Sequence, residues 1–318
     1  MDIAPSRDAL SLQGLTKSHG SLLAVDNLSL DVHRGEIFGF LGPNGAGKTT
    51  TINMICGLLG SDSGDVRIHG HLLKDEPGEC RKLLGLCPQD LVIWESLTCL
   101  EQLEFMARQY DVGPAAARGR ARELLDMLGL AGKGHSLAKT LSGGMKRRLN
   151  LALALCHDPQ VLILDEPQAE LDPQSRILVR EYIGSLAEKK TVILCTHDMD
   201  EVDRLAHRIA IIDHGRLLVL DTPERLKSRI GAGDILELKI AEGHEEELER
   251  LQQALPDDLR SLPSHHGTLR LVGVDTPTVL PPVLDRLRET GLPVQDLTIR
   301  KKTLEDVFIA LTGRRLRE

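Results

Sequence analysis

The segment Gly42-Pro-Asn-Gly-Ala-Gly-Lys48-Thr49 has the residue types and the spacing of a phosphate-binding loop, G-x(4)-G-K-[ST]. It lies between a short apolar run, 36–41, and a stretch from 49 to 59 that reads as a helix. Its glycines let backbone N–H groups surround phosphate oxygens, and the helix directs its positive end at the same oxygens. Lys48 would add a full charge at the β- and γ-phosphates, and the Thr49 hydroxyl would bind Mg²⁺. The segment predicts a nucleoside triphosphate site.

A second chemical feature is the acidic pair that ends the apolar run 161–164. Asp165 is suited to hold Mg²⁺, directly or through water, and Glu166 is a candidate general base facing the γ-phosphate. Taken alone the pair is a weak signal, because any buried strand can end in a charged turn. Gln89 and His197 are weak for the same reason, since a lone histidine after a strand is more often structural.

Taken together, in this order and at these separations, these residues are strong evidence, because the set resembles the ATPase of an ABC transporter. The set comprises Lys48, Gln89, Leu141-Ser-Gly-Gly-Met145, Asp165-Glu166-Pro167, Asp172 and His197. The resemblance covers residues 9–230, and its most specific part is the Leu-Ser-Gly-Gly string.

The resemblance implies a role for each residue of the set. It implies that nucleotide lies between two head-to-tail copies, with Ser142, Gly143 and Gly144 at the partner's γ-phosphate. It assigns Gln89 to the metal and to coupling, Asp172 to the loop between subunits, and His197 to the γ-phosphate. The expected catalytic residues are Glu166, His197 and Gln89, and the expected metal ligands are Thr49, Gln89 and Asp165. The expected ATP contacts are His19, Gly42, Pro43, Asn44, Gly45, Ala46, Gly47, Lys48, Thr49, Thr50, Ser142, Gly143, Gly144 and Asp172.

Three positions depart from the family's usual pattern. His19 stands where an aromatic ring usually stacks on adenine. Gln168 and Glu170 replace smaller residues in the stretch after Glu166, which adds bulk and charge near the expected subunit interface. His207-Arg208 replaces the usual Asp-Arg before a late strand, a change expected at the surface. None of these changes removes a group that performs chemistry.

Helices and strands that alternate along the chain must position these residues. Alternation predicts a mostly parallel sheet within an α/β fold, preceded by antiparallel strands over 9–29 and interrupted by a helical segment between Gln89 and Ser142. We therefore expect an ABC-type P-loop nucleotide-binding domain over 1–230, with an antiparallel β subdomain and a helical subdomain. A Gly-Ala-Gly break at 231–233 then predicts a small accessory α+β domain over 231–318, with strands near 235–240, 269–272 and 294–299 and helices near 244–255, 278–290 and 304–312.

Composition limits the function classes. A formal charge of −8 and 2% aromatic residues argue against a nucleic-acid partner. No apolar stretch approaches the ~18 residues of a membrane span, and the opening residues lack a secretion signal, so we expect a cytoplasmic chain held at the membrane by a partner. The six cysteines form no C-x-x-C pair and are expected to be reduced and buried.

Three function classes remain after these limits. The first is the ATP-hydrolysing subunit of an exporter that pairs with separate membrane-spanning subunits and with a second copy of itself. The segment 35–59 and the tail Thr303–Gly313 resemble the sequences of daunorubicin-resistance-type exporters and favour this class. The second class, a soluble ABC protein acting on ribosomes or DNA, usually carries two cassettes. The third, a regulator without turnover, is disfavoured by Glu166 and His197. The cargo is not visible in this sequence.

Overall fold

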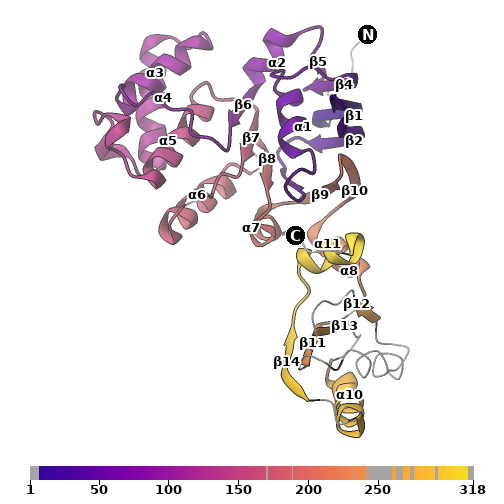
Figure 1. Cartoon of the computed structure of the whole chain (residues 1–318). Helices are drawn as coiled ribbons and strands as arrows, with labels where there is room; N and C mark the ends of the chain where they lie inside the picture. The colour runs from indigo at the N-terminus through magenta and orange to yellow at the C-terminus, as the bar shows by residue number, and fades with distance from the viewer. Residues whose placement is uncertain are drawn as a thin grey trace. The chain divides into compact units, whose positions relative to one another are not determined.

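The computed structural model describes residues 7–169, 171–187, 189–231, 233–240, 244, 260–262, 268–272, 276–290 and 293–313 (Figure 1). The chain divides into two compact units, Met1–Leu220 and Asp221–Glu318. The division falls before α8 (Pro223–Arg229), whereas the sequence placed the junction after Ile230. The reason is that α8 packs on α11 (Leu304–Thr312), a partner that lies far along the chain.

Two sheets form the larger unit, with the layout that the alternating pattern predicts. The first sheet has the order β2-β1-β4-β5, from β1 (Asp8–His19), β2 (Leu22–His33), β4 (Ser63–Ile68) and β5 (His71–Leu72), and its neighbours are antiparallel. The second has the order β10-β9-β3-β8-β7-β6, from β3 (Ile37–Leu41), β6 (Leu84–Cys87), β7 (Val161–Asp165), β8 (Thr191–Thr196), β9 (Arg208–Asp213) and β10 (Arg216–Asp221). Within this order the neighbours β9-β3-β8-β7-β6 all pair in parallel, which confirms the prediction of a mostly parallel sheet.

The helices of this unit form two groups in Figure 1. Helices α3, α4 and α5 gather on one side, while α1 lies against the antiparallel sheet on the other. Their bounds are α1 Lys48–Ile55, α2 Pro77–Leu83, α3 Cys99–Gln109, α4 Pro114–Met127, α5 Gly143–Leu155, α6 Pro173–Ser185 and α7 Met199–Leu205, with 3₁₀ turns at Ala131–Lys133 and Ala138–Thr140. The expected helical segment between Gln89 and Ser142 is therefore confirmed.

One apolar core holds the antiparallel sheet, α1 and the parallel sheet together. Leu12 of β1, Ile52 of α1 and Ile193 of β8 belong to the same buried cluster. The six cysteines are free and buried, as predicted. Within the described ranges, no helix combines the length and the apolar character that a bilayer-crossing segment needs.

The smaller unit has a four-stranded antiparallel sheet in the order β12-β13-β11-β14. Its elements are β11 (Ile235–Ile240), β12 (Arg260–Leu262), β13 (Thr268–Val272), α10 (Thr276–Thr290), β14 (Val294–Arg300) and the terminal helix α11. Leu238 and Leu271 of the sheet pack with Val283 and Leu287 of α10. These elements confirm the α+β pattern, while the helix expected near 244–255 lies outside the described residues.

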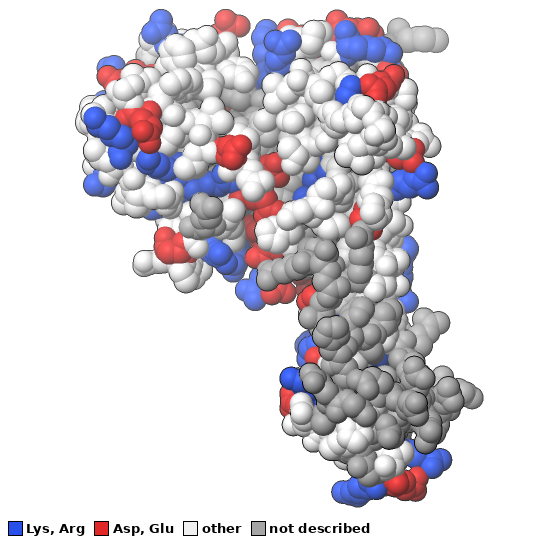
Figure 2. Space-filling model, viewed as in Figure 1, with Lys and Arg blue, Asp and Glu red and all other residues white. Residues whose placement is uncertain are grey.

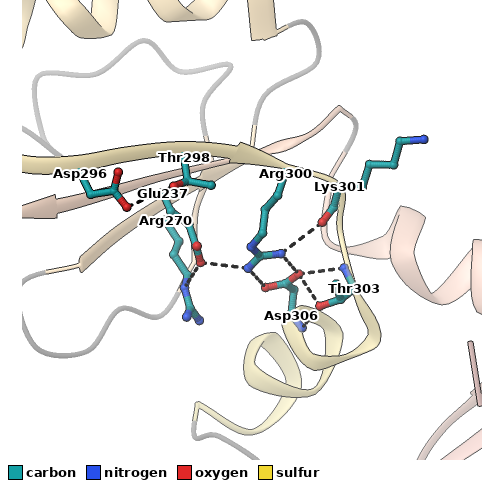
Figure 3. Close-up of polar contacts among 8 residues, drawn as sticks. All are labelled: Glu237, Arg270, Asp296, Thr298, Arg300, Lys301, Thr303 and Asp306. Carbon is teal, nitrogen blue, oxygen red and sulfur yellow. Dashed lines mark hydrogen bonds and ion pairs between the residues drawn. The ribbon is translucent and has the colours of Figure 1, made fainter. Parts of the chain in front are cut away.

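An ionic network links β11, β13, β14 and α11 in this unit (Figure 3). Arg300 donates two hydrogen bonds of 2.7 Å to Asp306 and one of 2.9 Å to Glu237, which also pairs with Arg270 at 2.8 Å. Asp306 is 2% exposed and forms a capping box with Thr303. Burial alone would raise the pKa of Asp306, but the hydrogen bonds from Arg300 and Thr303 outweigh it and lower the pKa. A lowered carboxyl pKa means that the network stabilises the fold above about pH 4 and loses this contribution as the solution is acidified.

Candidate active site

A cavity of 290 Å³ lies at the carboxyl ends of β3 and β7, where ligands bind in open parallel sheets. Most of the sequence-predicted nucleotide and metal residues meet there. The lining comprises His19, Leu22, Leu23, Ala24, Asn44, Gly45, Gly47, Lys48, Thr49, Thr50, Gln89, Asp165, Glu166 and His214. The glycine-rich loop, both carboxylates and Gln89 thus line one cavity, although Gln89 is distant in the sequence from the loop and from the carboxylates.

Close packing explains why the loop after β3 needs glycine. At Gly47, φ is 99° and an added Cβ would collide with the carbonyl oxygen of Ala24. At Gly42 an added Cβ would lie 2.5 Å from the carbonyl oxygen of Ile212. Pro43 and Ala46 form the turn between these glycines, with the Ala46 N–H donating to the Pro43 carbonyl at 3.1 Å. The loop is therefore pressed against its neighbours at both glycines, where a side chain would not fit.

Lys48 is held inside this loop. Its Nζ donates to the carbonyl oxygen of Gly42 at 2.6 Å and to that of Pro43 at 3.1 Å, and the residue is only 8% exposed. Burial lowers the pKa of Lys48, although Cys195 and the two acidic residues, Glu166 and Asp165, act in the opposite direction. A buried ammonium with only carbonyl partners is a good site for a phosphate, which would supply the missing negative charge.

The two carboxylates at the end of β7 are in different environments. Burial and then the neighbouring Glu166 raise the pKa of Asp165 to about 6, although the nearby Lys48 and Arg147 act in the opposite direction. Glu166 has a left-handed backbone, with φ of 49°, and accepts three hydrogen bonds. They come from Thr196 Oγ1 at 2.9 Å, from the His197 N–H at 2.9 Å and from the ring Nδ1 of His197 at 2.7 Å. The structure therefore places His197 directly on the candidate base.

Arg147 is a residue of the site that the sequence reasoning missed. It lies on α5, just after the Ser-Gly-Gly string, and is 5% exposed. Its guanidinium donates to the carbonyl oxygens of five residues in two loops, namely Pro88, Gln89, Asp165, Glu166 and Pro167. The only signal in the sequence was a run of three basic residues, 146–148, at the start of α5, a pattern that is typical of an exposed helix face. Arg147 fixes the segment at Gln89 against the end of β7.

The other predicted residues form a second group, apart from the cavity lining. Ser142 is the N-cap of α5, accepting from the Met145 N–H at 3.3 Å, and it is exposed. Asp172 caps α6 by accepting from the N–H groups of Gln174 and Ser175. A Cβ added at Gly144 would lie 3.3 Å from Asp172 Oδ2, so the string and the aspartate are neighbours. Two helix N-termini therefore meet at one surface. Gln168 is buried there, and Glu170 lies outside the described residues.

The donors in the cavity fit a nucleoside triphosphate with Mg²⁺. Thr49, Gln89 and Asp165 contribute a hydroxyl, an amide and a carboxylate, which are the hard oxygen ligands that Mg²⁺ prefers. Mg²⁺ in such sites takes one or two protein ligands and completes its shell with phosphate and water. Consistent with this, the described residues include no group of three or more His, Cys, Asp or Glu side chains arranged to hold a metal by themselves.

Comparison with known proteins decides the family. The family model described as ABC transporter matches residues 25–169. The daunorubicin/doxorubicin resistance ATP-binding protein DrrA of Streptomyces peucetius is 39% identical over 315 residues, covering 98% of this chain and 94% of DrrA. The chain belongs to the ABC transporter ATP-binding proteins. The Nod factor export ATP-binding protein I of Ralstonia nicotianae is 35% identical over 314 residues, covering 98% of this chain and 96% of that protein.

A solved structure of the same family extends the comparison to the reaction. A dimeric ATP-binding cassette in a post-hydrolysis state, bound to ADP and phosphate, is 28% identical with a TM-score of 0.62, covering 67% of this chain and 98% of that chain. Membership in the ABC family establishes this chain as an ATP-binding ATPase with the P-loop cassette fold. It confirms the fold class and the function that the motif set predicted.

Proposed function

We propose that two copies of this chain bind ATP and Mg²⁺ head to tail and drive export through a separate membrane-spanning permease. The observation that carries the proposal is the division of the predicted residues into two groups, one lining a cavity and one at a separate surface. Each group has helix N-terminal N–H groups that suit a phosphate, as expected if the nucleotide lies between two copies. The full-length relatives that act in drug resistance and Nod factor export support the direction of transport.

In this proposal each residue of the two groups has a specific role. Lys48 and the loop N–H groups bind the β- and γ-phosphates, and Thr49, Gln89 and Asp165 hold Mg²⁺, which neutralises charge on the transferred phosphoryl group. Glu166 orients water and takes its proton, while His197 holds the Glu166 carboxylate through Nδ1. Ser142, Gly143 and Gly144 of the second copy contact the γ-phosphate, and Asp172 lies at the boundary between copies.

The surface charge agrees with a protein partner rather than a nucleic acid. On the face shown in Figure 2, basic and acidic side chains of the larger unit are interspersed instead of forming one basic field. We propose that the chain lies at the cytoplasmic face of the membrane, attached through its permease. Co-purification of the tagged chain with a multi-span protein from detergent-solubilised membranes tests this, and its recovery with ribosomes or DNA instead would contradict it.

The segment after Gln89 is our candidate for the permease contact. Leu91, Val92, Trp94 and Phe105 are all exposed, and the Trp94 and Phe105 rings pack edge to face with centroids 5.6 Å apart. Exposed aromatic residues of this kind supply much of the binding energy at interfaces, about 2 kcal/mol or more each. We expect Trp94→Ala to reduce transport in vesicles at least about tenfold, while the ATPase rate of the isolated chain stays within about twofold.

A second exposed apolar residue, outside the docking segment, serves as a control. It shows whether any loss of exposed apolar surface reduces transport or only a loss at the permease contact. Leu218 is 40% exposed and lies on β10, at the other edge of the parallel sheet from β6, the strand that leads into this segment. Leu218→Ala should transport normally. If Trp94→Ala also transports normally, Trp94 does not contact the permease.

His19 is our candidate for the adenine contact, because it lines the cavity beside Leu22 and Leu23. Stacking of a base on an aromatic ring is worth roughly 1–3 kcal/mol, and imidazole offers a smaller face than phenol. We expect His19→Tyr to tighten ATP binding about fivefold or more by calorimetry, and His19→Ala to change it little. The exposed His135 provides a matched control as His135→Tyr. Equal ATP affinity in the wild type and His19→Tyr would remove His19 from the adenine site.

We propose that 231–318 is an accessory domain that holds two copies together or regulates turnover. The compact second unit supports this, since it has its own core and contains none of the cavity residues. Arg300→Met would leave Asp306 and Glu237 without their main partner. We expect hydrogen exchange of β11, β14 and α11 to accelerate up to about a hundredfold, equivalent to about 3 kcal/mol, with unchanged ATP affinity.

The control for this experiment is an exposed arginine. Arg288 forms only a surface pair with Asp285, so Arg288→Met should leave exchange unaltered. Loss of ATP binding in Arg300→Met would show that the C-terminal unit is part of the nucleotide-binding machinery and not an accessory.

A further inference from the structure

A second and larger cavity lies at the opposite end of the parallel sheet from the nucleotide site. It has a volume of 540 Å³ and lies where β3 and β9 begin. Its lining comprises Arg7, His33, Arg34, Gly35, Glu36, His207 and Arg208. Because β3 has five residues, its two ends are roughly 16 Å apart. This basic pocket is therefore separate from the phosphate-binding loop that follows β3.

The charge in the basic pocket is predominantly positive. Three guanidinium groups face one carboxylate, Glu36, which is 7% exposed and already paired with Arg208 at 3.1 Å. In the described part of the chain, the side chains of Arg7 and Arg34 have neither an ion pair nor a hydrogen bond. Two further acids lie nearby: Asp8 pairs with His33 Nδ1 at 2.9 Å, and Asp31 accepts from Arg208 through its backbone carbonyl oxygen at 3.1 Å. Two exposed arginines are thus available to a ligand in a chain whose formal charge is −8.

His207 adds a fixed donor to the pocket. The Ile37 N–H donates to His207 Nδ1 at 3.0 Å, and the His207 N–H donates back to the Ile37 carbonyl at 2.8 Å. A ring nitrogen that accepts from an amide carries no proton, so the proton of the neutral imidazole is on Nε2. His207 therefore presents an N–H donor where the family's usual aspartate would present a negative charge.

We propose that the basic pocket binds the phosphate group of a small, soluble phosphorylated molecule. Paired arginine forks match the oxygens of a phosphate, and the Nε2–H of His207 adds a third donor. The volume lies in the range of small-ligand sites, which is about 300–1,000 Å³. A carboxylate at position 207 would repel such an anion, whereas the histidine can donate to it. The pocket and its ligand are independent of the residues assigned to ATP hydrolysis.

Calorimetric titration with inorganic pyrophosphate tests the proposal, using the full-length chain with its nucleotide site saturated with ADP. We expect one-site binding that His207→Asp and Arg34→Ala each weaken about tenfold or more, as expected for a charge-assisted hydrogen bond. His207→Asn, which also accepts from the Ile37 N–H but carries no charge, should lose less affinity than His207→Asp. Arg67→Ala, an exposed arginine on β4, is the unaffected control. Unchanged ADP affinity in each variant shows that the fold is intact.

Three outcomes would overturn the proposal. The first is an absence of binding up to about 10 mM pyrophosphate, and the second is equal pyrophosphate binding by the wild type and His207→Asp. The third is His207-dependent sedimentation with phosphatidylglycerol vesicles that pyrophosphate does not compete away, which would make the ligand a lipid headgroup rather than a soluble molecule.

Discussion

Glu166→Gln is expected to lower the rate of ATP hydrolysis about a hundredfold or more while ATP affinity is retained. Glutamine has the shape of glutamate, so its oxygen can still accept from the His197 N–H, while its NH2 group can donate to the Thr196 hydroxyl, and the side chain stays in place. It cannot take a proton from water, and one of its two terminal atoms becomes a donor. The expected loss is therefore in turnover and not in binding. Because the ATP-bound state is no longer consumed, the variant should also sediment as a dimer when ATP is present.

Steady-state hydrolysis, ATP titration and analytical ultracentrifugation check these three expectations. Glu181→Gln, on the exposed side of α6, is the matched control and should hydrolyse ATP at the parental rate. If Glu166→Gln hydrolyses at that rate too, Glu166 is not the base, and its three hydrogen bonds serve only to shape the turn after β7.

Lys48→Ala is expected to weaken ATP binding by a factor of roughly thirty to several thousand. Removing one member of a buried charge pair typically costs about 2–5 kcal/mol, because the other charge is left unpaired. Here the unpaired group would be the triphosphate, in a loop where Lys48 Nζ is the buried cation. The alanine variant should fold normally, since the lysine donates only to two loop carbonyls, which water can solvate once the side chain is removed.

Calorimetry with ATP and circular dichroism together test this expectation. Lys82→Ala removes an exposed lysine of α2 and should bind ATP as the wild type does. Wild-type affinity in folded Lys48→Ala would mean that the nucleotide is held elsewhere, and the phosphate-binding assignment of 42–49 would be wrong.

Patterns of neighbouring residues in the sequence were sufficient to predict much of the fold. Thr98 and Glu101 have the capping-box spacing that predicts a helix start, and Ser142 is of a residue type that caps helices. The structure confirms both caps, at the starts of α3 and α5. These predictions succeed because a cap and the helix it starts are contiguous in the chain. The phosphate-binding loop succeeds for the same reason, since strand, loop and helix follow one another without interruption.

Features that depend on distant contacts could not be predicted in this way. Helix α8 reads as the end of the first domain, yet it packs on α11, about eighty residues later. The hydrogen bond between His197 and Glu166 joins two strand ends that are separate in the sequence. His207 reads as a harmless surface substitution until its position beside Arg34 and Arg7 is known. Each of these depends on a partner that no local pattern identifies.

Arg147 has a consequence for anyone who builds chimeras of this cassette. The helical segment between Gln89 and Ser142 resembles an interchangeable part, with both of its ends in loops. One guanidinium spans that boundary, because it starts on α5 and binds carbonyls at 88–89 and at 165–167. A graft that transfers the segment but stops before residue 147 would combine loops from one parent with the arginine of another. The smallest transferable piece therefore extends from Pro88 to Pro167, and it includes β7 with Asp165 at its end and Glu166 just after it.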